Sequence, residues 1–86
     1  MNSIPQMCES LEKARDEAEL RLQKHTCLDF EATKTCIHIN YHLVKAKDEN
    51  LGDVERGQAY QAATEYLQYL VGLADDVDAI MKGESE

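Results

Sequence analysis

The side chains of this sequence that are best suited to bind a metal ion are two histidines. His38 and His42 stand four residues apart, so on a helix both imidazoles project from the same face. That spacing can hold a transition metal when further ligands complete the coordination. Glu31 and Glu49 share this face, but each lies more than one turn from the nearer histidine. Two ligands do not make a metal site, so we assign no metal and expect a polar stripe that faces solvent.

The chain also has three cysteines, Cys8, Cys27 and Cys36, and no C-x-x-C pair. An odd number of thiols without such a pair is typical of a reducing compartment, so we expect a cytoplasmic protein with free cysteines. Cys8 and Cys36 fall on apolar helix flanks and are predicted to be small core residues, whereas Cys27 is expected to be the most exposed. A metal or thiol sensor is the alternative hypothesis for this chain, with ligands drawn from His25, Cys36, His38 and His42.

Catalytic and cofactor motifs are missing from the sequence. It contains no nucleophile–base pair, no glycine-rich phosphate loop and no cofactor fingerprint. We therefore predict a protein that is not an enzyme and that uses no cofactor.

The net charge of −8, from 17 acidic and 9 basic side chains, restricts the partners of this chain. Phosphate backbones and anionic lipids repel such a chain, so we expect it to bind neither nucleic acid nor a membrane surface. The N-terminus lacks the basic region and apolar core of a signal peptide, and no apolar run approaches the length of a membrane span. The charge favours a protein partner, and a basic one in particular.

Several side chains near the C-terminus are suited to contact such a partner. Asp75 and Asp76 form an acidic group close to a predicted helix end, where carboxylates oppose the helix dipole by up to about 1 kcal/mol each. Tyrosines are frequent anchors in interfaces, and Tyr69 stands at the margin of an apolar arc. The predicted partner-binding residues are Tyr60, Tyr69, Leu73, Asp75, Asp76 and Ile80.

These residues belong to one long amphipathic helix that is predicted from Asp53 to Lys82. Its apolar stripe recurs every three or four residues, at Ala63, Leu67, Leu70, Ala74, Val77 and Met81. Flanking apolar residues widen this arc to roughly half of the circumference, which is more than a seam between two helices needs. Asp53 is expected to cap the helix start, and Gly83 is expected to end the helix in a left-handed conformation.

The N-terminal segment predicts a helix over residues 4–25 with a narrow stripe at near-heptad spacing. The stripe consists of Ile4, Met7, Leu11, Ala14, Ala18, Leu22 and His25. Thr26 and Asp29 can form a capping box that starts a second helix after a short break. No glycine or proline occurs between Gln6 and Leu51, however, so a single helix from Ile4 to about Asn50, roughly 70 Å long, is the competing prediction.

The middle segment alternates apolar and polar residues between Thr33 and Val44, as a β-strand does. Over a longer window the helical period explains the pattern better, so we predict a helix over residues 28–50. This helix is apolar on two flanks. One flank consists of Phe30, Ile37, Tyr41 and Val44, and the other of Leu28, Ala32, Cys36, Ile39, Leu43 and Ala46.

Together these segments predict a single all-α domain over residues 1–86, with helices at about 4–25, 28–50 and 53–82. Two architectures fit: an antiparallel three-helix bundle, or a long helical hairpin whose uncovered stripe needs a second copy. A chain of this length buries only about 60% of its unfolded surface, so we expect dimerisation, in the manner of a coiled coil, to complete the core. The predicted function is a small acidic protein-binding module: an adaptor, a chaperone-like protein, or an inhibitor or regulator of its partner.

Overall fold

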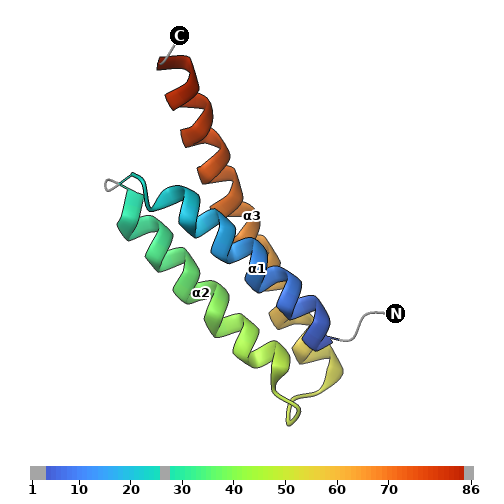
Figure 1. The fold of residues 1–86 in the computed structure, drawn as a ribbon. Coiled ribbons are helices and arrows are strands. Elements are labelled where there is room, and N and C mark those ends of the chain that lie inside the picture. Colours follow the sequence, from blue (N-terminus) through green and yellow to red (C-terminus); the bar gives the residue numbers. More distant parts are fainter. Residues whose placement is uncertain (1–3, 26–27, 85–86) are drawn as a thin grey trace.

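The computed structural model of this chain describes residues 4–25 and 28–84, most of which lie in three α-helices (Figure 1). The helices are α1 (Ile4–Leu22), α2 (Asp29–Lys47) and α3 (Asp53–Glu84). They run antiparallel in succession, and each packs against the other two. The part of the chain that the structure describes contains no β-strand. The predicted all-α bundle is therefore confirmed.

The chain reverses direction directly after α1, which excludes the single long helix to Asn50. The N–H of His25 donates to the carbonyl of Leu22 at 3.0 Å, and the N–H of Leu28 donates to the carbonyl of His25 at 3.0 Å. These tight turns end α1 three residues before the predicted end. Of the two predicted architectures, the three-helix bundle is the one observed.

The second reversal lies between α2 and α3. The N–H of Asp48 donates to the carbonyl of Lys45 at 3.1 Å, so α2 ends at Lys47 and not at the predicted residue 50. The Asp48 carboxylate accepts the N–H of Asn50 at 2.9 Å, which fixes the turn. The Arg56 guanidinium donates to the carbonyl of Ala46 at 2.9 Å. It thereby satisfies one of the free carbonyls at the end of α2 and ties the start of α3 to it.

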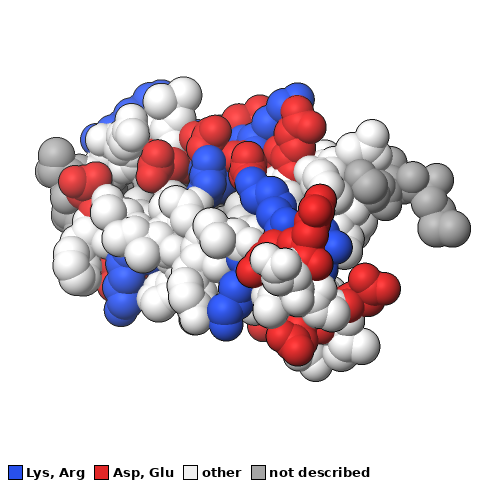
Figure 2. Space-filling model, turned by 90° about the horizontal axis from the view of Figure 1, so that it is seen from below, with Lys and Arg blue, Asp and Glu red and all other residues white. Residues whose placement is uncertain are grey.

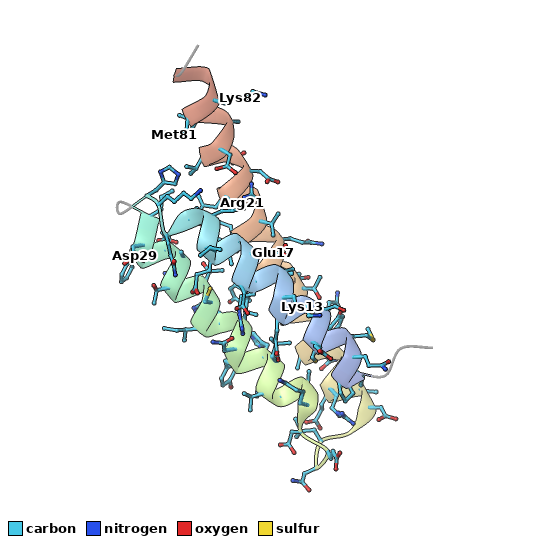
Figure 3. All side chains as sticks on the ribbon, viewed as in Figure 1. Lys13, Glu17, Arg21, Asp29, Met81 and Lys82 are labelled. Carbon is cyan, nitrogen blue, oxygen red and sulfur yellow. The ribbon has the colours of Figure 1, made fainter. Side chains whose placement is uncertain are left out.

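The prediction for the C-terminal end of α3 is wrong. The helix passes through Gly83 to Glu84, and no described glycine has a positive φ, so Gly83 does not end the helix in a left-handed conformation. The last turns extend beyond α1 and α2, where Met81 and Lys82 are labelled in Figure 3. Met81 is 48% exposed although it belongs to the predicted apolar stripe, because no neighbouring helix reaches this end.

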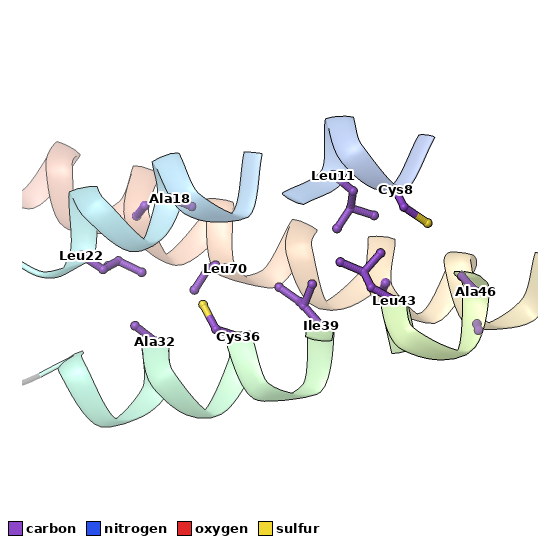
Figure 4. Packing of buried hydrophobic residues seen from close by; sticks show 13 residues of the cluster. Cys8, Leu11, Ala18, Leu22, Ala32, Cys36, Ile39, Leu43, Ala46 and Leu70 are labelled. Carbon is purple, nitrogen blue, oxygen red and sulfur yellow. The ribbon is translucent and has the colours of Figure 1, made fainter. Parts of the chain in front are cut away.

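The core is one cluster that draws on all three helices (Figure 4). Leu22, Ile39 and Leu70 have no exposed surface and are its largest fully buried side chains, along with Cys8. Burying a leucine or isoleucine stabilises the fold by about 1.5–3 kcal/mol. Small residues fill the remaining contacts and let the helix backbones approach one another. The buried alanines are Ala18, Ala32, Ala46, Ala59, Ala63 and Ala74.

Candidate protein-binding surfaces

An open groove runs between α2 and α3, on the side that α1 leaves uncovered. Its volume is about 670 Å³, and its lining comes from these two helices alone. The lining residues are Glu31, Lys34, Thr35, His38, His42, Ala62, Glu65, Tyr66 and Tyr69. The polar stripe that the sequence places toward solvent therefore lies, over its middle part, inside a groove between helices. Thr35 is buried there and His38 and His42 are half-buried, so this part of the stripe is less exposed than expected, whereas Lys34 faces solvent.

Stacked rings form the floor of the groove. The Tyr66 ring lies parallel to the His38 imidazole, with 4.9 Å between ring centroids and 8° between planes. It also stacks on His42, at 5.7 Å and 17°. The His42 ring in turn meets the edge of Tyr41 at 5.2 Å. Such pairs contribute about 0.5–1.5 kcal/mol beyond the area they bury, so the stack helps to hold α2 against α3.

The surroundings of His42 keep its imidazole uncharged at neutral pH. Burial, followed by the positive charge of Lys45 and by His38, lowers the pKa of His42 below its ordinary value. Each of these causes disfavours the protonated ring. The floor of the groove consequently presents aromatic surface with a neutral His42.

Two hydrogen bonds involve other polar groups of the groove. The hydroxyl of buried Thr35 donates to the carbonyl of Glu31 at 2.8 Å, one helical turn back. The Tyr69 hydroxyl donates to the carboxylate of Glu31 at 3.4 Å, which links the two walls. Glu65 is exposed at the opposite wall. The groove is thus aromatic at its floor and carries carboxylates on both walls, together with the basic side chain of Lys34 on the α2 side.

His38 and His42 of the sensor hypothesis lie together on Tyr66, but His25 and Cys36 do not join them. His25 precedes α2, whereas His42 lies 14 residues beyond Leu28, about 21 Å farther along the helix. Cys36 is on the core flank of α2, against Glu19 of α1. Among the residues that the structure describes, no three His, Cys, Asp or Glu side chains gather as metal ligands would.

The two described thiols are free and buried. Burial, with a hydrogen bond to Glu19 as the next cause, raises the pKa of Cys36 to about 12. Burial also raises the pKa of Cys8. Thiols in such surroundings stay protonated and are poor nucleophiles, which suits the core role predicted for both. Cys27, predicted to be the most exposed thiol, lies outside the described residues.

The structure does not gather the six predicted partner-binding residues on one surface. Tyr60 and Leu73 are half-buried and pack against the core. Tyr69 is 52% exposed and lines the groove. Asp76 and Ile80 are exposed near the projecting end of α3.

Asp75, the sixth of these residues, pairs with α1. The Arg21 guanidinium contacts the carboxylates of Asp75 at 2.7 Å and Asp78 at 2.6 Å. Arg21 is labelled on α1 in Figure 3, beside α3. Part of the predicted acidic patch therefore joins two helices of the bundle.

One exposed surface was not among the predicted sites. The flank formed by Phe30, Ile37, Tyr41 and Val44 is solvent-exposed, and only the opposite flank of α2 packs in the core. We call these four residues the outer stripe. The signal in the sequence is the spacing of Phe30, Ile37 and Val44, which recur every seven residues as in a coiled-coil seam.

Charged residues are distributed over the surface in a mixed pattern. Figure 2 shows a face on which acidic and basic side chains are interspersed, with a broad uncharged area between them. None of the helices in the described part of the chain has the length and apolar character needed to cross a bilayer. Comparisons with protein-family models, with curated proteins and with solved structures found no match for this chain.

Proposed function

We propose that this chain is a small, acidic, non-enzymatic protein-binding module that takes an amphipathic helix of a partner into the groove between α2 and α3. The supporting observation is the groove itself, which is open and floored by stacked aromatic rings. Seating an amphipathic helix in such a groove is a common mode of recognition. A fourth helix at this position would give the bundle the familiar four-helix arrangement.

The lining of the groove determines the chemistry of this helix. Tyr66 and Tyr69 provide rigid rings that can contact apolar anchor residues and lose little conformational freedom on binding. Glu31 and Glu65 stand at the walls, and Asp76 lies exposed farther along α3. We therefore expect one apolar face and flanking lysines or arginines in the partner helix.

The net charge of −8 contributes mainly to the rate and selectivity of this encounter. Complementary charge accelerates association and disfavours partners of the same sign more than it adds affinity. Binding should consequently weaken as the salt concentration rises. An adaptor, a chaperone-like protein and an inhibitor would all use this same step, in which a helix of the partner is covered.

Affinity capture from the source cell tests this proposal when it compares matched variants. The double variant Tyr66→Ala/Tyr69→Ala removes the aromatic floor and wall, and Glu65→Arg reverses one wall charge without touching the core. Leu20→Ala is the control, because Leu20 is 64% exposed on α1, outside the groove.

We expect the partner recovered by the wild-type protein to be retained by the control and to bind at least about tenfold more weakly to the double variant. Glu65→Arg should weaken capture less, and mainly at low salt. Circular dichroism must show that each variant keeps its helices. If every captured protein binds the groove variants as well as it binds the control, the groove is not a binding site.

A further inference from the structure

The outer stripe gathers four exposed apolar side chains on one face of α2. Phe30, Ile37, Tyr41 and Val44 are 75%, 61%, 56% and 68% exposed. They lie on the side of α2 that is turned away from α1 and α3, opposite the buried flank with Ile39. A helix that is apolar on two opposite faces usually lies between two layers of protein. This monomer supplies only one of those layers.

The dimensions of the stripe match a second helix. Phe30 and Val44 are 14 residues apart, about 21 Å along the helix axis. The heptad spacing of Phe30, Ile37 and Val44 keeps the stripe in line with a straight partner helix. Thr33 and Asn40 border it on one side and Lys34 on the other, so its margins are polar.

The charges at the two ends of α2 identify the partner. The first turn carries Asp29 and Glu31, and the last turn carries Lys45 and Lys47, which also pairs with Glu12 of α1. This order already complements the dipole of α2. Beside an antiparallel copy of α2, each acidic first turn also faces a basic last turn, whereas a parallel copy would place like charges together. The acidic helix α3 offers no such match, since carboxylates outnumber basic groups along it.

We propose that two copies of this chain associate through their outer stripes, with the two α2 helices antiparallel and related by a twofold axis near Ile37. Phe30 of each copy then packs against Val44 of the other, and the surface is complementary to itself, as a twofold interface requires. The groove lies on the α3 side of α2, and Lys34 stands at the margin of both surfaces. Self-association goes beyond the proposed partner binding and is tested by different residues.

Sedimentation over a range of protein concentrations measures this association. The wild-type protein shifts from the mass of one chain to the mass of two as concentration rises. Ile37→Glu places two carboxylates at the axis and raises the dissociation constant at least about a hundredfold. Leu20→Glu, at a comparably exposed apolar position on α1, leaves the dimer unchanged. A wild-type protein that stays monomeric at every concentration, or equal disruption by both variants, overturns the proposal.

Disulfide formation tests the orientation of the two copies. Cys8 and Cys36 are buried, so a Cys27→Ser background leaves the introduced thiol as the accessible one among the described residues. We expect a mixture of Phe30→Cys and Val44→Cys proteins to form mixed disulfide dimers, because that pair meets only in the antiparallel arrangement. Each variant alone should cross-link poorly. If each variant links to itself as readily as the mixture does, the helices are parallel and the proposed arrangement is wrong.

Discussion

Ile37 and Ile39 provide a controlled comparison of the two faces of α2, because the same side chain stands on each. Ile39 has no exposed surface and lies in the core with Leu22 and Leu70 (Figure 4). Ile37, in contrast, is 61% exposed. Both positions are helical and two residues apart, so an alanine changes helix propensity equally at each. The difference between Ile37→Ala and Ile39→Ala therefore measures burial.

The expected magnitudes are far apart. Truncating a fully buried isoleucine to alanine costs about 2–5 kcal/mol, which includes the cavity that remains. At about 0.05–0.15 kcal/mol per residue, the whole domain has a free energy of unfolding on the order of 4–13 kcal/mol. Ile39→Ala consequently removes a large share of the stability, while Ile37→Ala changes that of the monomer by no more than about 0.5 kcal/mol. Ile39→Val, at about 0.5–1.5 kcal/mol, is the milder variant if the alanine variant does not fold.

Urea unfolding followed by circular dichroism, at a concentration where the protein is monomeric, gives both values. The free energy of unfolding falls by about 1–3 kcal/mol per molar urea. The stability lost in Ile39→Ala should therefore lower the urea midpoint by on the order of 1 M or more. At high protein concentration the wild-type midpoint should rise, and Ile37→Ala should reduce that rise. Equal losses for the two variants in dilute solution would refute the assignment of core and outer faces on α2.

Gly72, His42 and the thiols each provide a further test. Gly72→Ala should stabilise the domain by about 0.5–1 kcal/mol in urea unfolding, because a Cβ at this helical position meets no atom within 4 Å; a loss of stability would contradict this packing. His42 should titrate below pH 6.5 by NMR, and Lys45→Ala should raise its pKa; a value at or above 6.5 contradicts the surroundings described. Folding lowers the pKa of His42, so the stability that the uncharged imidazole contributes is complete above about pH 6.5. This contribution is lost as the pH falls through the pKa of His42 in the folded protein. Of the three thiols, Cys8 and Cys36 should react with a disulfide reagent only when urea unfolds the chain, and rapid reaction of more than one thiol in the native protein would show that the core opens readily.

Helical periodicity was sufficient to predict much of the fold. The stripe of α1 and the centre of the α3 stripe fall where the buried residues Leu11, Leu22, Ala63 and Leu70 are found. These segments are apolar on a single arc, so the sequence leaves one way to orient them. The ends of the helices were less predictable. Hydrogen-bonded turns follow Leu22 and Lys47, but no glycine or proline stands at those positions to indicate a turn.

The orientation of α2 could not be predicted, because the helix has two apolar flanks. The buried flank includes Ala32, Cys36 and Ala46, whose small side chains allow close packing, whereas the exposed flank carries Phe30 and Tyr41. The helical period is the same for both flanks, so it does not indicate which of them is buried. The packing of the three helices determines which flank faces the core. The groove could not be predicted for the same reason, because its position depends on which face of α2 packs against α3.

The individual partner residues depended on tertiary contacts in a similar way. Tyr69 was placed at the margin of an apolar arc, and it does line the groove. Tyr60 is of a residue type that often anchors an interface, but both it and Leu73 pack against the core. A helical pattern gives the direction of a side chain around its own axis, and it does not give the neighbour that the side chain meets.

Site-specific photo-crosslinking inside the source cell tests most directly whether this protein works by binding another protein through its groove. A photoreactive residue in place of Tyr69 probes the groove, and one in place of Leu20 on α1 provides the background. We expect a distinct adduct with another protein from position 69, absent from position 20 and reduced by Glu65→Arg. Identical products from the two positions would contradict it.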